Sequence, residues 1–210
     1  MPAMKDREYR NMVLEIRQVE DENEDKIVRG YASTFDEPYT LYENDDWRFD
    51  EVVDARAFDN TDMSDVIMQY DHEGRVFARM SNNTLTVTPD ERGLLIEANL
   101  GGTELGRQLY EEIRGGYTNK MSFGFTVDGE EVKDSKAADG KSLTVRRITS
   151  VRKLYDVSAV SIPANDATSI SVRSLTDGEI ERIRAERLEA EKLELRRRKL
   201  LAKAKLNGGQ

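Results

Sequence analysis

Short runs of β-branched and aromatic residues, separated by turn residues, recur along most of this chain, from about Val13 to Val172. Runs of this length are typical of strands rather than of helices. An acidic turn joins the first two runs in a predicted hairpin, and Pro89, Asp90 and Gly93 form the loop of a second one. We therefore expect a mainly β fold with α additions, arranged as a small closed or nearly closed β-barrel. The runs are VLEIRQVE, KIVRGYASTF, DVIMQYDH, TLTVTPDERGLLIEANL, KMSFGFTV, LTVRRITSV and KLYDVSAVSI.

One helix is predicted among the strands. Thr103 is suited to cap its N-terminus, and a pair of glycines starting at Gly115 ends it. One face of this helix is lined by Leu105, Leu109 and Ile113. The polar stretch EVKDSKAADGK, which lies between two later strand runs, predicts a mobile loop.

The charge changes sharply toward the C-terminus. Residues 176–206 contain ten Lys/Arg and seven Asp/Glu, a net charge of +3, so the rest of the chain carries −12 to reach the total of −9. Thr176 and Glu179 have the spacing of a capping box at the start of this segment. We expect a β domain over residues 1–174 and one long charged helix over residues 175–210, which either docks on a partner or is solvated.

Composition excludes several classes of protein. A net charge of −9 argues against a chain whose main task is to grip nucleic acid. The absence of cysteine removes disulfides and thiolate nucleophiles, and a single histidine excludes a histidine-rich zinc site. No apolar run is long enough to span a bilayer, and the charged start MPAMKDREYR lacks the core of a signal peptide. We expect a soluble intracellular protein without a cofactor or metal.

The stretch NKMSFGF contains a serine in an otherwise apolar strand. As a strand, it places Met121, Phe123 and Phe125 on one face, and Ser122 and Gly124 on the other. A glycine on the same face as the serine leaves room for another backbone to approach closely. Alternation shows only that the hydroxyl is available, because polar residues often occupy the outer face of a strand.

Covalent peptide chemistry requires a nucleophile, a base and a group that orients the base. Without cysteine the nucleophile must be Ser, Thr or Lys, and the only imidazole is that of His72. In the strand run DVIMQYDH, His72 has the same parity as Met68 and Tyr70, so we expect it at the border of an apolar face. That environment suits a neutral imidazole, but a lone histidine is more often structural or merely exposed.

The order of the motifs adds a resemblance. From about Ile27 to Ser171 the chain contains RGYASTFD, EVVDARAF, DHEGRVFAR, the predicted helix, NKMSFGF and LYDVSAVSIPANDAT. In this order the motifs resemble those of the prohead (capsid maturation) proteases of tailed bacteriophages, distant relatives of the herpesvirus assembly proteases. The resemblance is to a histidine motif, a serine motif of the form S-x-G-F and the signature L-x-E-V-S-x-V-x-x-P-A-N. It implies that the expected barrel is of the herpesvirus-protease type.

The resemblance also implies roles for individual residues. It makes Ser122 the nucleophile, His72 the general base, and Gly124 the position where the substrate backbone lies close. Herpesvirus relatives use a loop with paired arginines to stabilise the oxyanion. Arg146 and Arg147 lie in a strand-like run instead, where surface charges on an edge strand are the simpler interpretation, so we do not assign them that role.

The third member of the catalytic set is less well defined by the resemblance. Asp156 stands in the final signature where the family commonly has glutamate. Aspartate is one methylene shorter, so an orienting hydrogen bond to His72 requires a slightly different backbone position. Asp71, next to the histidine, and Asp166, in PANDAT, remain alternatives.

The function implied is that of a phage prohead maturation serine protease, a serine endopeptidase. Its implied substrates are the scaffold protein or the delta segment of the major capsid protein, together with the protease itself, and its place is the assembling procapsid in the host cytoplasm. The tail over residues 175–210 then serves as a scaffold-docking or packaging element that self-cleavage could remove. We expect no membrane partner and no specific nucleic acid, and homo-oligomerisation stays open. The alternative is a non-catalytic capsid assembly or scaffolding module that retains the protease fold.

Overall fold

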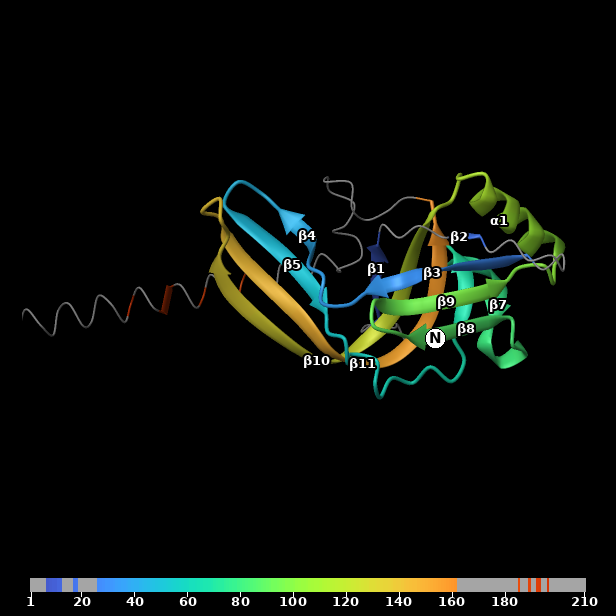
Figure 1. The fold of residues 1–210 in the computed structure, drawn as a ribbon. Coiled ribbons are helices and arrows are strands. Elements are labelled where there is room, and N and C mark those ends of the chain that lie inside the picture. The colour runs from blue at the N-terminus through green and yellow to red at the C-terminus, as the bar shows by residue number, and fades with distance from the viewer. Residues whose placement is uncertain are drawn as a thin grey trace, which may run out of the picture. The chain divides into compact units, whose positions relative to one another are not determined.

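The computed structural model describes residues 7–12, 17–18 and 26–161, together with residues 185, 189, 192, 193 and 196 (Figure 1). The chain divides into two compact units, Met1–Ser174 and Leu175–Gln210. The elements of the first unit are β1 (Glu8–Met12), β2 (Arg17–Gln18), β3 (Ile27–Thr34), β4 (Tyr39–Glu43), β5 (Trp47–Val53), β6 (Ile67–Tyr70), β7 (Glu73–Arg79), a short 3-10 helix η1 (Met80–Asn82), β8 (Leu85–Pro89), β9 (Gly93–Asn99), α1 (Glu104–Arg114), β10 (Lys120–Lys136) and β11 (Ser142–Val160).

The larger sheet, sheet A, is built around two long antiparallel strands, β10 and β11. Its strand order is β1-β10-β11-β5-β4, and β6 also pairs with β11 and carries β7 at its other edge. Strand β11 therefore has two parallel neighbours one after the other: β5 along Ser142–Ile148 and β6 along Asp156–Ala159. This double pairing brings the β6–β7 hairpin next to the end of β11 that carries the final signature.

Beyond the body, β10 and β11 continue as a ribbon that β5 and β4 extend (Figure 1). The polar stretch that predicted a mobile loop lies mostly in this ribbon: β10 runs to Lys136, and only residues 137–141 form the turn. The loop prediction is wrong because residues 131–136 are exposed, so no alternation marks them as a strand. Several register shifts interrupt the β10–β11 ladder between Gly124 and Glu130, where the ribbon leaves the body.

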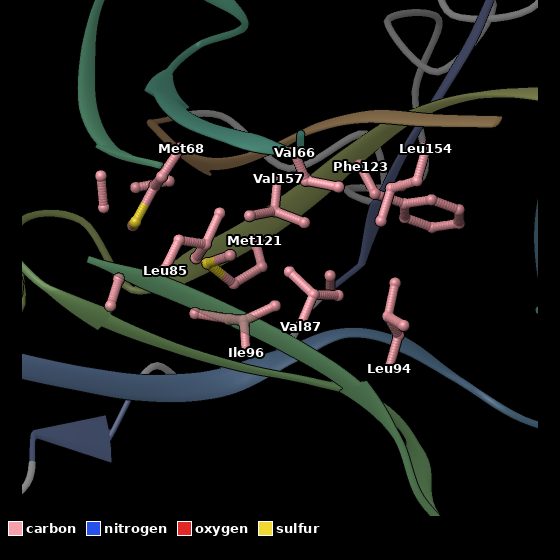
Figure 2. Packing of buried hydrophobic residues seen from close by; sticks show 14 of the residues in the cluster. Val66, Met68, Leu85, Val87, Leu94, Ile96, Met121, Phe123, Leu154 and Val157 are labelled. Atoms are coloured by element: carbon pink, nitrogen blue, oxygen red, sulfur yellow. The ribbon is translucent and has the colours of Figure 1, made fainter. Parts of the chain in front are cut away.

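The smaller sheet, sheet B, has the order β2-β3-β9-β8 and packs its apolar face against sheet A. Both predicted hairpins are confirmed in the described residues, as β2–β3 and β8–β9. Figure 2 shows side chains of both sheets meeting in one core. The side chains labelled there are Val66, Met68, Leu85, Val87, Leu94, Ile96, Met121, Phe123, Leu154 and Val157.

The mainly β character is as expected, but the predicted closed or nearly closed barrel is wrong. Within the described residues, no hydrogen-bonded ladder joins sheet A to sheet B. The two sheets face each other across the core and keep separate edges. Alternation in the sequence predicts which face of each strand is buried, but it does not determine which strand edges pair, because edge pairing depends on contacts distant in the chain.

Helix α1 spans Glu104–Arg114, as its sequence predicts. The side chain of Thr103 accepts a hydrogen bond from the backbone N–H of Gly106 at 2.9 Å, and Gly115 follows the last turn. Leu109 and Ile113 are buried against the core, whereas Leu105 is exposed, so the apolar face is narrower than expected.

The prediction of a long C-terminal helix is also wrong. No long helix is seen in the described part of residues 175–210, and most of the predicted helix lies outside the described residues. The roles predicted for the two parts of the chain stay predictions. Within the part of the chain that the structure describes, no helix is long and apolar enough to cross a membrane.

Candidate active site

Ser122 lies on β10 with its side chain on the face opposite the core. Its neighbours Met121 and Phe123 are fully buried in the core, which confirms the predicted alternation. Across the ladder Ser122 faces Ser158 of β11 on one side and Asn11 of β1 on the other. Unlike a typical outward-facing strand residue, Ser122 has no exposed area, and its hydroxyl donates a hydrogen bond to the backbone carbonyl of Arg10 in β1 at 2.9 Å.

His72 reaches Ser122 from a tight turn rather than from a strand. Strand β6 ends at Tyr70, which pairs with Glu73 of β7, so Asp71 and His72 form a two-residue hairpin loop. Both loop residues have positive φ, 47° and 60°, as a type I′ turn requires. Aspartate and histidine tolerate this left-handed conformation better than most residues. The expected strand position of His72 is therefore wrong, since the strand ends two residues earlier.

The three side chains implied by the resemblance form one hydrogen-bonded series. The Nε2 atom of His72 is 2.5 Å from Oγ of Ser122, and its Nδ1 atom contacts Oδ2 of Asp156. An ionised carboxylate only accepts hydrogen bonds, so this contact assigns the ring proton to Nδ1. The other nitrogen, Nε2, is then free to accept the proton of the serine hydroxyl. This is the arrangement that a histidine acting as a general base requires.

Asp156 is held firmly in place behind the histidine. It lies opposite Gly124 in the β10–β11 ladder and is fully buried. Ser158, two residues along on the same face of β11, donates a hydrogen bond to Oδ2 at 3.0 Å, and the guanidinium of Arg7 pairs with Oδ1. Both carboxylate oxygens are thus engaged, which fixes the direction in which Oδ2 faces the imidazole of His72.

The two alternative acids differ in their positions. The carboxylate of Asp71 accepts hydrogen bonds from the backbone N–H and the hydroxyl of Ser161, at 2.9 and 2.8 Å, and so ties the hairpin loop to the end of β11. Asp166 lies outside the described residues. Among the described acids, Asp156 is the one that hydrogen-bonds the ring of His72.

Gly124 is a point of close approach, as its sequence context predicts. A Cβ atom at this position would lie 2.4 Å from Oδ1 of Asp156, 2.9 Å from the ring of Tyr9 and 3.0 Å from Nε of Arg7. Any side chain would therefore push against both the carboxylate and β1. In this structure the neighbouring backbone beside Gly124 is β1, with Tyr9 as the paired residue.

The two arginines considered for the oxyanion have other partners. Arg146 is buried and pairs with Glu8, Glu51 and Glu130. Arg147 pairs with Asp36 and Asp54. Their strand, β11, is an interior strand of sheet A, so the interpretation as surface charges on an edge strand is wrong for Arg146.

Sequence reasoning missed three residues of the site. Ser158 could have been found, because it follows Asp156 by two residues and so shares its face of a strand. Arg7 and Tyr9 carried no such signal: they lie in a short charged segment ahead of the predicted body. Tyr9 packs edge-on against His72 with ring centroids 4.4 Å apart.

Burial lowers the pKa of His72 to about 4, and the charge of Arg7 acts in the same direction, while Asp71 opposes it. The guanidinium of Arg7 also pairs with Asp156. Its positive charge offsets the negative charge of that carboxylate, which would otherwise stabilise the protonated imidazole. The imidazole is therefore neutral near pH 7, the form in which it can accept a proton.

This pKa predicts a loss of stability in mild acid. Between pH about 6.5 and about 4 the unfolded chain binds a proton at its only histidine, whereas the folded chain does not. The free energy of unfolding should therefore decrease as the pH falls through this range, by about 3 kcal/mol for this group. Urea unfolding of the wild type and of His72→Gln at pH 7 and pH 4.5 measures the effect.

The comparison isolates the histidine because the other titrating groups are common to both proteins. As the pH falls, the free energy of unfolding should decrease more for the wild type than for His72→Gln. Parallel pH profiles for the two proteins would contradict the lowered pKa of His72.

A comparison with protein families identifies the chain. The family model described as caudovirus prohead serine protease matches residues 12–182. The chain belongs to this family. Caudovirus prohead serine proteases are serine peptidases of phage capsid maturation, which implies capsid or scaffold proteins as substrates and action inside the procapsid. The prediction of the prohead protease family is thus confirmed. Searches among curated proteins and among solved structures gave no significant match.

Proposed function

We propose that this prohead protease chain is an active serine endopeptidase in which Ser122, His72 and Asp156 perform the reaction. The observation that carries the proposal is the hydrogen-bonded series from Oγ of Ser122 through His72 to Asp156 in a chain of a serine peptidase family. The lowered pKa of His72 supports it, since a neutral imidazole is the base that the reaction needs.

The proposed reaction proceeds in two steps. In the first, Oγ of Ser122 bonds to the carbonyl carbon of the substrate while its proton moves to Nε2 of His72. The C–N bond then breaks, and the leaving amine takes that proton from His72. In the second step, water loses a proton to Nε2 and attacks the acyl-enzyme, which releases the carboxyl product and returns the proton to Oγ. Asp156 keeps Nδ1 protonated and stabilises the imidazolium throughout.

The proposed substrates are the scaffold protein or the delta segment of the major capsid protein, and the protease itself, inside the procapsid. The charged residues 175–210 would dock the enzyme on the scaffold or package it. Gly124 is proposed to contribute to substrate binding, because the absence of a side chain lets an extended backbone lie beside the nucleophile.

Coexpression with the capsid and scaffold proteins of the same phage tests this function. We expect procapsids formed with the wild-type chain to contain shortened capsid or scaffold protein, with new termini visible by mass spectrometry. With His72→Gln those substrates should keep their full length in particles that still assemble. Full-length substrates in both samples would favour the non-catalytic assembly module instead.

A further inference from the structure

Strand β1 occupies the edge of β10 at the nucleophile. Its register places Tyr9 opposite Gly124, Arg10 opposite Phe123 and Asn11 opposite Ser122. The pairing is antiparallel, and it uses the side of β10 that β11 leaves free. The family model matches from residue 12 onward, so nearly all of β1 lies ahead of the matched segment.

Every member of the proposed catalytic set is in contact with β1 or with Arg7, the residue just ahead of it. The backbone carbonyl of Arg10 accepts a hydrogen bond from Oγ of Ser122 at 2.9 Å. Tyr9 covers the ring of His72, and Arg7, just ahead of the strand, pairs with Asp156. With Ser122 fully buried under these contacts, no second peptide can reach its hydroxyl while β1 is in place.

The hydroxyl of Ser122 has one proton but two acceptors beside it. Nε2 of His72 lies at 2.5 Å and the carbonyl oxygen of Arg10 at 2.9 Å. When the proton is donated to the carbonyl, it is not donated to the base. A main-chain carbonyl thus lies at the nucleophile, as that of a substrate would, and competes with the step that activates the nucleophile.

The contacts of the Arg10 side chain indicate which type of side chain binds best at this edge of β10. Arg10 is 1% exposed, and its Nε and Nη2 atoms both bind the carboxylate of Glu51, at 2.5 and 2.9 Å. A planar guanidinium in such a two-point contact is a specific arrangement that a neutral side chain cannot reproduce. The hydroxyl of Tyr39 donates a hydrogen bond to Oε1 of the same carboxylate.

Without β1, the charges that remain around Glu51 favour a basic side chain. Glu8 and Arg10 both lie on β1, so among the described residues the ion-pair cluster then retains Glu51, Glu130 and Arg146. Two carboxylates against one guanidinium leave a net charge of −1. Glu8 and Arg10 cancel each other, so the net charge is the same with β1 in place. What leaves with β1 is the cation that pairs with the fully buried carboxylate of Glu51, and a basic side chain in its place neutralises that carboxylate.

We propose that the edge of β10 covered by β1 is the substrate-binding edge, and that it binds an extended peptide antiparallel to β10 with a basic residue, preferably arginine, over Glu51. That residue supplies the carbonyl that Ser122 attacks, as the position of Arg10 indicates. Strand β1 is the intramolecular stand-in for the substrate and keeps the enzyme inactive until it is displaced. This inference rests on the proposed peptidase function of Ser122.

Labelling of Ser122 measures the blockade by β1. A fluorophosphonate forms a bond from phosphorus to Oγ and releases fluoride, with the proton passing to His72, so its rate reports access to an activated serine. In the full-length chain, Arg10→Gln should raise the labelling rate by about 10-fold, because β1 loses its anchor. Arg29→Gln, which removes an exposed ion pair with Glu97, is the matched control and should leave the rate unchanged.

Tyr9→Ala provides a second variant that keeps the Arg10–Glu51 pair. It should also raise the labelling rate, because it uncovers His72. Thermal unfolding checks that each variant is folded. Unchanged rates in folded Arg10→Gln and Tyr9→Ala would overturn the blockade.

Peptide hydrolysis measures the selectivity. The probe is a blocked tetrapeptide with the sequence of residues 7–10 and a fluorogenic amide at its end, in which the last residue is arginine or its neutral isostere citrulline. For Arg10→Gln we expect kcat/KM for the arginine peptide to exceed that for the citrulline peptide by at least about 30-fold. Adding Glu51→Gln should bring this ratio down to about one, because the carboxylate that selects the charge is gone.

The outcomes separate this inference from the function on which it rests. If Ser122 is labelled but the arginine and citrulline peptides are hydrolysed at equal rates, the basic specificity is overturned and the serine peptidase function stands. Absence of both labelling and hydrolysis in all folded variants would overturn the peptidase function, and this inference with it.

Discussion

Replacing Ser122 with alanine should lower kcat for peptide hydrolysis by about a millionfold, to the level left by substrate binding alone. The reason is the hydrogen-bonded series at the site: the hydroxyl of Ser122 is the group next to Nε2 of His72, and alanine has no atom that could take its place. The loss should be in kcat, because the substrate-binding surface is unchanged. Since β1 covers Ser122, steady-state hydrolysis of a fluorogenic peptide is compared between Arg10→Gln and the double variant Arg10→Gln/Ser122→Ala, and the two kcat values give the ratio.

Ser135→Ala is a matched control on the same strand. Ser135 is exposed near the far end of β10, so the same chemical change there should leave kcat within a factor of about two. Mass spectrometry after fluorophosphonate treatment should find the label on Ser122 in the control and no label in Ser122→Ala. Appreciable turnover by Ser122→Ala would assign the nucleophile to another residue.

Asp156→Asn should lower kcat by about ten-thousandfold although Asp156 does not touch the substrate. The amide of asparagine can donate a hydrogen bond to Nδ1 of His72, which moves the ring proton to Nε2. A protonated Nε2 cannot accept the hydroxyl proton of Ser122. Asp156 thus acts as a positioning residue, and its loss changes the tautomer rather than removing a reacting group.

The tautomer can be observed directly because the chain has one histidine. In ¹⁵N spectra of protein without an affinity tag, the protonated ring nitrogen should be Nδ1 in the wild type and Nε2 in Asp156→Asn. Asp128→Asn, on the exposed part of β10, is the control and should keep both the wild-type spectrum and the wild-type kcat. A large loss of kcat without a change of tautomer would mean that Asp156 acts only through the fold.

The sequence predicts best where one face of an element is buried. Alternation around Ser122 correctly placed Met121, Phe123 and Phe125 in the core, and the capping pattern at Thr103 correctly predicted α1. In both cases the signal is local, and burial of one face enforces the period. The family could also be predicted from the sequence, because its motifs are short segments that occur in a characteristic order.

Other features depend on contacts that no local pattern encodes. The outer half of β10 is exposed, so its polar residues resemble a loop. His72 occupies a left-handed turn that alternation extended into a strand. Strand β1 pairs with a segment more than a hundred residues away, as the contact between Arg10 and Ser122 illustrates, and its charged sequence gave no hint of a buried position. The prediction of a closed barrel was wrong for the same reason, because the pairing of strand edges depends on contacts between residues far apart in the chain.

The register shifts in the β10–β11 ladder divide these strands into two parts. The rows from Lys120 to Gly124 hold Ser122 and Asp156 in place, whereas the outer ribbon begins past the shifts and ends at the turn formed by residues 137–141. Bulges absorb changes in strand alignment locally. The turn is therefore a position where a peptide tag or a reporter domain could be inserted without disturbing the chemistry, which would make the protease visible inside an assembling particle.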